Sequence, residues 1–310
     1  MPDIVISEFM DEPAVKALAA DFDTHYDPDL VDKPAELARL VADARALVVR
    51  NRTQVRGALL EAAPKLKAVG RLGVGLDNID VPACQARGVQ VMPATGANDQ
   101  SVAEYVIAGA LMLLRGAYFA TAEVAAGAWP RNRLMGREGE GTTLGIVGFG
   151  GIGRRVAACA KPFGMRLIGH DPFLRDDNPA WAENGVAPAG LDQVLAQSDV
   201  VTLHVPLTDG TRNLIDPARI ETMKPGAIVI NAARGGIVDE AALAAALKRG
   251  RLGGAMLDVF AREPLTAENP FAGVPNLILT PHIAGVTVQS NERVSAVTAA
   301  NVRRVLEGVK

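Results

Sequence analysis

The sequence predicts an α/β protein built from two doubly wound parallel-sheet domains. Apolar runs alternate with amphipathic helical stretches in two successive blocks of the chain. These runs are continuously apolar, as strands require in a parallel sheet that is covered on both faces. The chain has 310 residues, which is enough for two domains that each bury a core.

The predicted strands fall into the two blocks. In the first block, strands are expected at Ile4–Ser7, Ala46–Val49, Ala68–Gly73 and Val89–Met92. In the second block, they are expected at Thr142–Gly148, Met165–Asp171, Asp199–Val205, Ala227–Ala233, Gly254–Phe260 and Asn276–Thr280. The helices between them include one around Pro34–Ala42 and one that Asp239 caps and Gly250 ends. Repeated alternation of strand and helix predicts doubly wound sheets.

Two helices are predicted at the borders of the second block. The segment Ser101–Arg115 precedes that block, and Val286–Val309 follows its last strand. Both lie outside the strand–helix alternation, so we expect them to follow crossings between the domains. The first domain is then discontinuous, with residues 1–100 and 286–310, and the second domain covers residues 101–285.

Composition and charge exclude several classes of protein. The 32 Lys and Arg residues nearly balance the 35 Asp and Glu residues, which argues against nucleic acid or an anionic membrane as a partner. The apolar segment Tyr105–Leu114 is too short to cross a bilayer, and the first residues lack the features of a signal peptide. Cys84 and Cys159 share no metal-like spacing. We therefore expect a cytoplasmic protein with reduced thiols and no metal.

A glycine-rich turn directly follows the first strand of the second block. In Gly148-Phe149-Gly150-Gly151-Ile152-Gly153, the first glycine allows a tight turn, the second admits a pyrophosphate and the third permits close helix packing. The amides at the start of the next helix, at Gly151 and Ile152, then face the phosphates. The turn predicts a dinucleotide site.

An acidic residue at the end of the next strand indicates which dinucleotide binds. Asp171 lies roughly 20 residues after Gly148, where a carboxylate accepts hydrogen bonds from the adenosine ribose. A carboxylate at that position repels a 2′-phosphate, so we expect NAD. The nearby Arg154, Arg155 and Arg175 keep some use of NADP open.

Polar residues after the last three strands form the predicted catalytic group. Arg234, Glu263 and His282 follow these strands, and ligands of doubly wound sheets bind beyond the carboxyl ends of the strands. An arginine fork binds a carboxylate, and a histidine moves a proton near neutral pH. An acidic neighbour orients the imidazole. The group predicts hydride transfer between NAD and C2 of a 2-hydroxy or 2-oxo acid.

The motifs GFGGIG, HDP, HVPLT, NAARGG, LDVFAREP and TPHIAG resemble those of the D-isomer-specific 2-hydroxyacid dehydrogenases. The segments VGRLGVGLDNID, SVAEY and WPRNRLMG are similar to the phosphoglycerate dehydrogenase branch. The resemblance covers essentially the whole chain. It implies a Rossmann cofactor domain (residues 101–285), a flavodoxin-like substrate domain, and a homodimer formed through residues 101–140. No room is expected for the regulatory domain of longer members.

The resemblance also implies roles for individual residues. It assigns Arg234, Glu263 and His282 to the catalytic triad. Further cofactor contacts are implied for Val74, His204, Val205, Pro206, Thr211, Ala232, Ala233, Arg234, Asp258, His282 and Gly285. Substrate contacts are implied for Arg52, Leu72, Gly73, Val74, Gly75, Arg234 and His282. The chain departs from many members at Gly151, where they carry an arginine that reaches the pyrophosphate.

The substrate stays open among several acids. Arg52, Arg131 and Arg133 can neutralise a second anionic group, so 3-phosphoglycerate is expected first. Sulfolactate satisfies the same cations, while glyoxylate or hydroxypyruvate needs fewer of them. An NAD(H)-sensing, corepressor-like protein is a remote alternative. Formate oxidation is disfavoured because formate dehydrogenases of this fold pair their histidine with glutamine, where this chain has Glu263.

Overall fold

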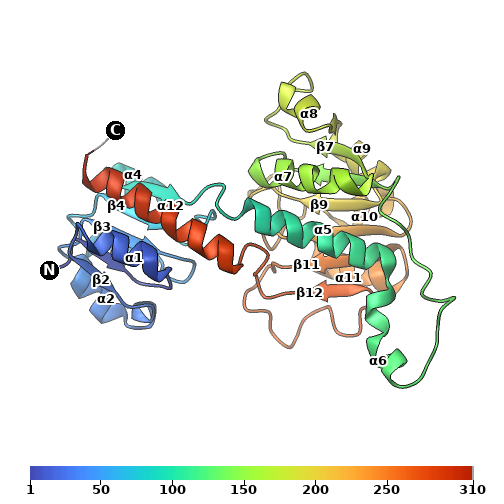
Figure 1. The fold of residues 1–310 in the computed structure, drawn as a ribbon, viewed down its shortest axis with the longest axis horizontal. Helices are drawn as coiled ribbons and strands as arrows, with labels where there is room; N and C mark the ends of the chain where they lie inside the picture. The colour runs from blue at the N-terminus through green and yellow to red at the C-terminus, as the bar shows by residue number, and fades with distance from the viewer. Residues whose placement is uncertain (309–310) are drawn as a thin grey trace. The chain divides into compact units, whose positions relative to one another are not determined.

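The computed structural model of the chain describes residues 1–308. They form two compact units, the first made of Met1–Asn98 with residues 286–308 and the second of Asp99–Gly285. Each unit contains one parallel β-sheet with helices on both of its faces (Figure 1). The predicted α/β class with two doubly wound sheets is confirmed.

The first unit has a five-stranded sheet in the order β2-β1-β3-β4-β5. This is the flavodoxin-like order that the resemblance implied. The strands are β1 (Ile4–Ile6), β2 (Thr24–Tyr26), β3 (Ala46–Val49), β4 (Ala68–Arg71) and β5 (Gln90–Pro93).

Helices cover both faces of this first sheet. One face packs against α1 (Glu12–Ala19) and α12 (Val288–Leu306), and the other against α2 (Pro34–Val41), α3 (Gly57–Glu61) and α4 (Val81–Ala86). At Gly70 in β4, a Cβ atom would lie 2.7 Å from a methyl of Val302. The glycine therefore lets α12 approach the sheet closely. The last residue of the predicted terminal helix, Val309, lies outside the described residues.

The second unit has a seven-stranded sheet in the order β12-β11-β10-β9-β6-β7-β8. Its first strand, β6, lies between β9 and β7, so the strand order reverses beside it, as in dinucleotide-binding sheets. The strands are β6 (Thr143–Val147), β7 (Arg166–His170), β8 (Ala187–Pro188), β9 (Val200–Leu203), β10 (Ala227–Asn231), β11 (Leu252–Leu257) and β12 (Leu277–Leu279).

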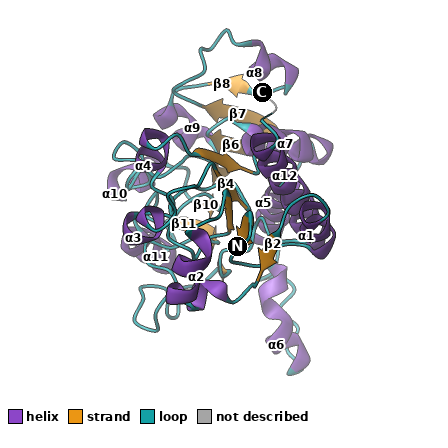
Figure 2. Ribbon diagram, turned by 90° about the vertical axis from the view of Figure 1, so that its left-hand side faces the viewer, coloured by secondary structure: helices purple, strands orange, loops and turns teal. Residues whose placement is uncertain are grey.

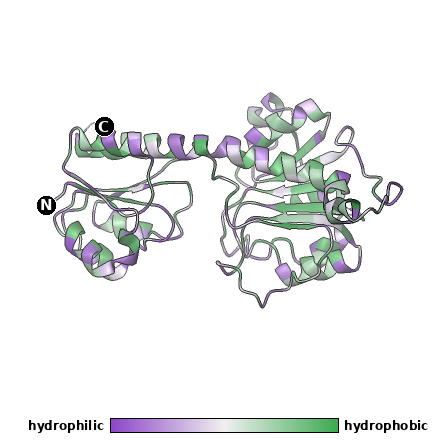
Figure 3. Cartoon of the chain, turned by 60° about the horizontal axis from the view of Figure 1, so that its bottom comes forward, coloured by the Kyte–Doolittle hydropathy of each residue, from purple (hydrophilic) through white to green (hydrophobic). Residues whose placement is uncertain are grey.

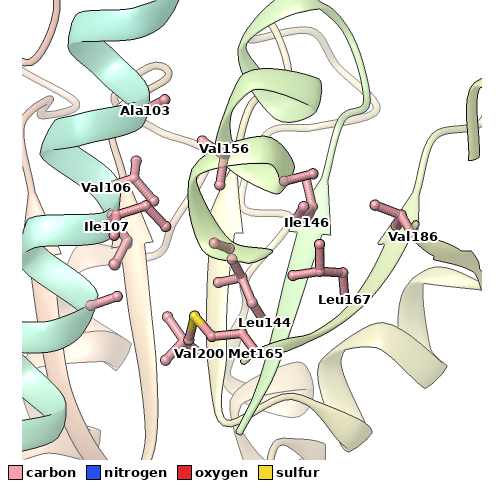
Figure 4. Close-up of a cluster of buried hydrophobic side chains, with 14 of the residues drawn as sticks. Ala103, Val106, Ile107, Leu144, Ile146, Val156, Met165, Leu167, Val186 and Val200 are labelled. Atoms are coloured by element: carbon pink, nitrogen blue, oxygen red, sulfur yellow. The ribbon is translucent and has the colours of Figure 1, made fainter. Parts of the chain in front are cut away.

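Two hydrophobic layers enclose this second sheet. On one face lie α5 (Asp99–Arg115), α7 (Gly151–Ala160) and α8 (Pro179–Glu183), and Figure 4 shows side chains of α5 and α7 meeting those of the strands. On the other face lie α9 (Leu191–Gln197), α10 (Pro217–Thr222) and α11 (Glu240–Lys248). Figure 3 shows the hydrophobic strands of this unit between helices of mixed hydropathy. The predicted cap of α11 is present, because Asp239 accepts a hydrogen bond from the Ala242 amide.

Two short strands, β2 and β8, were not predicted from the sequence. Both lie at the edge of a sheet, where one side has no neighbouring strand. Their residues are only partly buried or exposed. Neither β2 nor β8 has the continuous apolar run by which the other strands were predicted.

An arm, residues 117–140, links α5 to the sheet of the second unit. It includes α6 (Thr121–Ala125) and extends away from that sheet (Figures 1 and 2). Five large apolar side chains are exposed on it: Tyr118, Phe119, Val124, Trp129 and Met135. No single helix within residues 1–308 is long and apolar enough to cross a membrane. Helix α5 and Ala117–Ala125 meet that criterion together, but they bend by 69°.

Asp199 ties three segments together at the start of β9. Its carboxylate accepts hydrogen bonds from the Thr143 amide (2.9 Å), Arg137 Nη2 (2.5 Å) and Lys224 Nζ (3.0 Å). Burial alone would raise the pKa of Asp199, but these donors lower it to about 2. The ionised carboxylate therefore stabilises the fold above its unfolded pKa, and this stabilisation is lost as the pH falls towards 2.

We expect Asp199→Asn to lower the free energy of unfolding at pH 7 by about 2 kcal/mol. The difference from wild type should shrink as the pH falls from 4 to 2, because wild-type Asp199 then becomes protonated. Urea unfolding at several pH values measures both effects. Asp192→Asn is the control, since Asp192 forms an exposed ion pair with Arg219. An equal effect of the two substitutions would contradict the assignment.

Candidate active site

The predicted site residues of the second unit follow the carboxyl ends of neighbouring strands. Because all strands of this sheet are parallel, these ends lie along one edge. Across the sheet from β7 to β12, the edge carries in turn Asp171, the glycine turn, His204, Arg234, Asp258 and His282. Three strand spacings, about 14 Å in total, separate β7 from β10. The residues predicted to contact the ribose, the pyrophosphate and the nicotinamide therefore follow one another in this order along the edge.

The glycine turn after β6 has the shape that a pyrophosphate needs. Gly148 has a φ of +93°, and a Cβ atom there would lie 2.4 Å from the His204 carbonyl oxygen. At Gly153 a Cβ atom would lie 2.3 Å from the carbonyl oxygen of Gly148. Beside Gly150, by contrast, no atom lies within 4 Å of such a position. The first and third glycines therefore shape the turn, and the second leaves space for a ligand over the start of α7.

The departure from the family pattern at Gly151 has a structural counterpart. A Cβ atom at Gly151 would lie 2.3 Å from Oδ2 of Asp99, the first residue of α5. Burial raises the pKa of Asp99, and the charge of Arg155 lowers it to a smaller extent. A carboxylate thus occupies the space that a side chain at position 151 would enter.

Asp171 is held in place by the backbone on both sides. Its Oδ2 accepts a hydrogen bond from the Phe149 amide in the glycine turn (2.8 Å), and its Oδ1 accepts one from the Phe173 amide (2.9 Å). Each carboxylate oxygen has a further lone pair, so both can still accept from ribose hydroxyls. Arg175, one of the arginines that kept the use of NADP open in the sequence analysis, forms an exposed ion pair with Asp177.

We expect Asp171→Ala to weaken NADH binding about tenfold or more and to narrow the preference for NADH over NADPH. The substitution removes an acceptor for the ribose and also releases the Phe149 amide. Fluorescence titration with each dinucleotide measures both dissociation constants. Asp177→Ala should leave both constants unchanged. A constant ratio of the two affinities in Asp171→Ala would refute the ribose assignment.

His204 lies behind the glycine turn and stays uncharged. Its Nε2 forms a hydrogen bond with Thr202 Oγ1 (2.9 Å), and burial lowers the pKa of the imidazole to about 4. Nδ1 has no hydrogen-bond partner within residues 1–308. In the loop that follows, Thr211 Oγ1 donates to the Pro206 carbonyl (2.6 Å) and accepts from the Thr208 amide (2.7 Å). His204 and this loop lie at the carboxyl edge of the sheet, and the imidazole of His204 is neutral at neutral pH.

Asn231, at the end of β10, holds the turn that carries Arg234. Its Nδ2 donates to the Arg234 carbonyl (2.9 Å), and its Oδ1 accepts from the Ala233 amide (3.1 Å). The Arg234 guanidinium donates to the Ala233 carbonyl (2.6 Å). At Gly235 a Cβ atom would lie 1.8 Å from the Phe260 carbonyl, so this turn lies directly against the loop after β11.

The imidazole of His282 contacts the carboxylate of Glu263. Nδ1 of the ring lies 2.7 Å from Glu263 Oε2, and Glu263 Oε1 accepts a hydrogen bond from the Phe260 amide (3.0 Å). Because an ionised carboxylate only accepts hydrogen bonds, Nδ1 carries a proton and Nε2 is left for another partner. The histidine side chain is 46% exposed.

Asp258 directly follows β11 and is buried. Its Oδ1 accepts from Thr280 Oγ1 (2.6 Å) and from the Ile283 amide (2.7 Å), and its Oδ2 accepts from the Ala284 amide (2.7 Å). Its carbonyl accepts from the His282 amide (2.8 Å). The resemblance implied only a nicotinamide contact for Asp258. The structure shows in addition that this residue holds the loop of His282.

In the first unit, Glu8 holds the loop that carries Arg52. Its carboxylate accepts hydrogen bonds from the amides of all four residues from Arg50 to Thr53. Burial alone would raise the pKa of Glu8, but these donors lower it below its usual value. The guanidinium of Arg52 forms an exposed ion pair with Asp32.

Arg71 organises the predicted substrate segment Leu72–Gly75 in a similar way. Its guanidinium donates to the carbonyls of Leu72 (2.5 Å) and Gly75 (2.7 Å). The Gly73 amide donates to the Arg71 carbonyl, and the Gly73 carbonyl accepts from the Ala94 amide. Val74 remains 37% exposed.

Sequence reasoning missed Glu8, Asn231 and Thr280 as residues that hold site loops. Glu8 lies just after β1, where the search for polar residues at strand ends would have found it in the first block as well. Asn231 and Thr280 had been included in predicted strands. Nothing in a single sequence indicates which loops their side chains contact.

Comparisons with known proteins identify this arrangement. The profile of the D-isomer specific 2-hydroxyacid dehydrogenase NAD-binding domain matches residues 107–284. The chain belongs to the D-isomer-specific 2-hydroxyacid dehydrogenase family. It is thus an NAD-dependent dehydrogenase of 2-hydroxy acids, and the glycine turn and Asp171 fit the dinucleotide.

Several relatives of this dehydrogenase have curated names or solved structures. It is 57% identical to an (S)-sulfolactate dehydrogenase of Chromohalobacter salexigens over 99% of both chains. It is 39% identical to a D-3-phosphoglycerate dehydrogenase of Methanocaldococcus jannaschii, over 99% of this chain but only 58% of that longer chain. A D-lactate dehydrogenase of Aquifex aeolicus has been solved with NAD and lactic acid. It is 31% identical to this chain, and the match covers 98% of this chain and 96% of that one with a TM-score of 0.85.

Proposed function

We propose that this dehydrogenase interconverts (S)-sulfolactate and 3-sulfopyruvate with NAD as the hydride carrier. The observation that carries the proposal is the 57% identity with the Chromohalobacter salexigens enzyme, which covers 99% of both chains. The Methanocaldococcus jannaschii phosphoglycerate dehydrogenase is less similar, at 39%. This ranking reverses the order expected from the sequence alone, where 3-phosphoglycerate came first.

The configuration of (S)-sulfolactate agrees with a D-isomer-specific enzyme. In the naming rules sulfur outranks oxygen, so the CH2SO3⁻ group ranks above the carboxylate at C2. In lactate the methyl group ranks below the carboxylate. This exchange of ranks changes the descriptor from R in D-lactate to S in sulfolactate although no substituent moves. (S)-Sulfolactate is therefore the D-isomer.

In this proposal the triad acts on the carboxylate and the hydroxyl of the substrate. NAD, when bound, accepts the hydride from C2 or returns it. The planar guanidinium of Arg234 binds the carboxylate through two parallel hydrogen bonds. Nε2 of His282 takes the hydroxyl proton during oxidation and donates it during reduction. Glu263 holds the ring by Nδ1 and stabilises the charge that the imidazole gains.

In this proposal Arg52, or Arg131 and Arg133 of the arm, neutralises the second anionic group of the substrate. Arg52 pairs with Asp32 and Arg133 with Glu123, in both cases through exposed side chains. Such surface pairs contribute about 0–1 kcal/mol each, so a ligand can displace them at little cost. A sulfonate carries one charge directly on C3. A phosphate monoester carries nearly two charges and lies one atom farther away.

The substrate is tested by following NADH oxidation with 3-sulfopyruvate, phosphohydroxypyruvate, hydroxypyruvate, glyoxylate and pyruvate. We expect kcat/KM for 3-sulfopyruvate to exceed every other value by about tenfold or more. Arg52→Gln should lower kcat/KM for 3-sulfopyruvate and leave that for pyruvate unchanged, because pyruvate has no second anion. If kcat/KM were higher for phosphohydroxypyruvate than for 3-sulfopyruvate, the substrate would be phosphoglycerate. If kcat/KM were highest for pyruvate, the enzyme would not recognise a second anionic group.

We also propose that the protein is a homodimer formed through the arm. The apolar side chains exposed there include Trp129 (77% exposed) and Met135 (82% exposed). Apolar surface of this kind is typical of protein interfaces. Sedimentation velocity should give a dimer for the wild type and a monomer for the double variant Trp129→Glu, Met135→Glu. A monomeric wild type would contradict this proposal.

A further inference from the structure

Asp258 holds the loop that carries His282 in two ways. Its carboxylate accepts hydrogen bonds from the amides of Ile283 and Ala284, and its main-chain carbonyl accepts one from the His282 amide. The backbone of His282 has a φ of +56°, in the left-handed region that non-glycine residues rarely adopt. A residue in this region persists only where its surroundings hold it. Here the amides of His282, Ile283 and Ala284 all donate to Asp258. The position of the imidazole therefore depends on how firmly the Asp258 carboxylate is fixed.

The side chain of Thr280 fixes that carboxylate from outside the loop. Thr280 Oγ1 donates its proton to Asp258 Oδ1 at 2.6 Å. The same oxygen lies 2.6 Å from the hydroxyl of Tyr105. A threonine hydroxyl has only one proton, so the donor in this second bond must be Tyr105. The hydrogen bonds thus run in one direction, from Tyr105 to Thr280 and from Thr280 to Asp258.

Tyr105 is itself held by the packing of α5. Gly109 lies four residues after Tyr105 and therefore on the same face of the helix. A Cβ atom at Gly109 would lie 2.1 Å from Sδ of Met256 in β11. The glycine lets α5 lie close to the strand that precedes Asp258. Burial, chiefly, raises the pKa of Tyr105 to about 12, so the phenol keeps its proton at any ordinary assay pH.

We propose that Tyr105 is a positioning residue for His282, acting through Thr280 and Asp258. Its hydroxyl touches neither the substrate nor the imidazole in this scheme. It occupies the oxygen of Thr280 so that the threonine proton points to the Asp258 carboxylate, and this carboxylate then holds the amides of Ile283 and Ala284, the two residues that follow His282. The inference rests on the proposed role of His282 in proton transfer.

A double-mutant cycle between Tyr105 and Thr280 tests this inference. Tyr105→Phe removes the donor and keeps the ring, and we expect kcat to fall about fivefold, as for the loss of one hydrogen bond. Thr280→Val keeps the shape of the side chain, and we expect a fall of about 10- to 100-fold, because the lost bond is to a charged group. In the Thr280→Val background, Tyr105→Phe should have no further effect, since its only route to Asp258 is gone.

An equal effect of Tyr105→Phe in both backgrounds would overturn the proposal, because it would show that the hydroxyl acts by another route. The absence of any effect in the wild-type background would overturn it as well. Thr280→Ser is the rescue variant: it restores a hydroxyl, so kcat should return to within about threefold of wild type. Failure of this rescue would also contradict the proposal. Tyr26→Phe, which removes a hydroxyl bonded to the backbone of Met10 in the first unit, is the matched control and should leave kcat unchanged.

Hydrogen exchange gives a readout that does not depend on activity. In Tyr105→Phe and Thr280→Val, the amides of Ile283 and Ala284 should exchange faster than in wild type, while the amides of β6 should not. Uniformly faster exchange would indicate general destabilisation and would overturn the positioning role. If His282→Asn retained activity, the proposed function would fail. If His282→Asn were inactive but the effects of Tyr105→Phe and Thr280→Val on kcat were additive, only the positioning role of Tyr105 would fail.

Discussion

Replacing His282 by asparagine is expected to lower kcat for 3-sulfopyruvate reduction about 1000-fold. Asparagine can still accept or donate a hydrogen bond, but it cannot release a proton to the forming alkoxide. The dissociation constant of NADH should stay within about twofold of wild type, because the glycine turn and Asp171 hold the dinucleotide elsewhere on the edge. Stopped-flow NADH oxidation and fluorescence titration measure the two quantities.

Two further variants make this test specific. Glu263→Gln keeps a hydrogen bond to Nδ1 but removes the negative charge, so kcat should fall by a smaller factor, about tenfold. Glu268→Gln changes an exposed glutamate in the same loop and should have no effect. Turnover by His282→Asn within tenfold of wild type would show that another group, or water, supplies the proton.

The second large effect is expected at Arg234. Lysine keeps the positive charge but cannot form two parallel hydrogen bonds with a carboxylate. We therefore expect Arg234→Lys to lower kcat/KM about 100-fold, with much of the change in KM. Steady-state kinetics with 3-sulfopyruvate separate the change in kcat from the change in KM.

The control for Arg234→Lys is Arg249→Lys. Arg249 is an exposed arginine that pairs with Glu221 at the end of α11. Its replacement by lysine should leave kcat and KM unchanged. If Arg234→Lys behaved in the same way as Arg249→Lys, Arg234 would have no part in binding the carboxylate.

The central parts of both sheets could be predicted because burial leaves a clear pattern in sequence. β6, β9 and β10 are buried at every position, so each consists mainly of apolar residues. β2 and β8 are short and only partly buried, and neither consists of a run of apolar residues. The predicted strand Gly254–Phe260 also ends earlier in the structure, at Leu257. Apolar residues after a strand, such as Val259 and Phe260, cannot be distinguished from strand residues by hydropathy.

The candidate site was predicted in its parts but not in its internal bonds. The rule that ligands bind at the carboxyl ends of parallel strands selected Glu263 and His282, which the structure brings into contact. The link between Tyr105 and Thr280 joins residues 175 positions apart. Neither side chain carries a local signal, because a tyrosine in a helix and a threonine before a proline are ordinary. Only the packing of α5 on β11 brings them together.

We propose that this dehydrogenase oxidises a D-configured hydroxy acid that carries a sulfonate. The most direct measurement is NADH formation from the separate enantiomers of sulfolactate under identical conditions. We expect oxidation of (S)-sulfolactate with a kcat/KM about 100-fold or more above that for (R)-sulfolactate. Equal rates with the two enantiomers, or faster oxidation of (R)-sulfolactate, would contradict it.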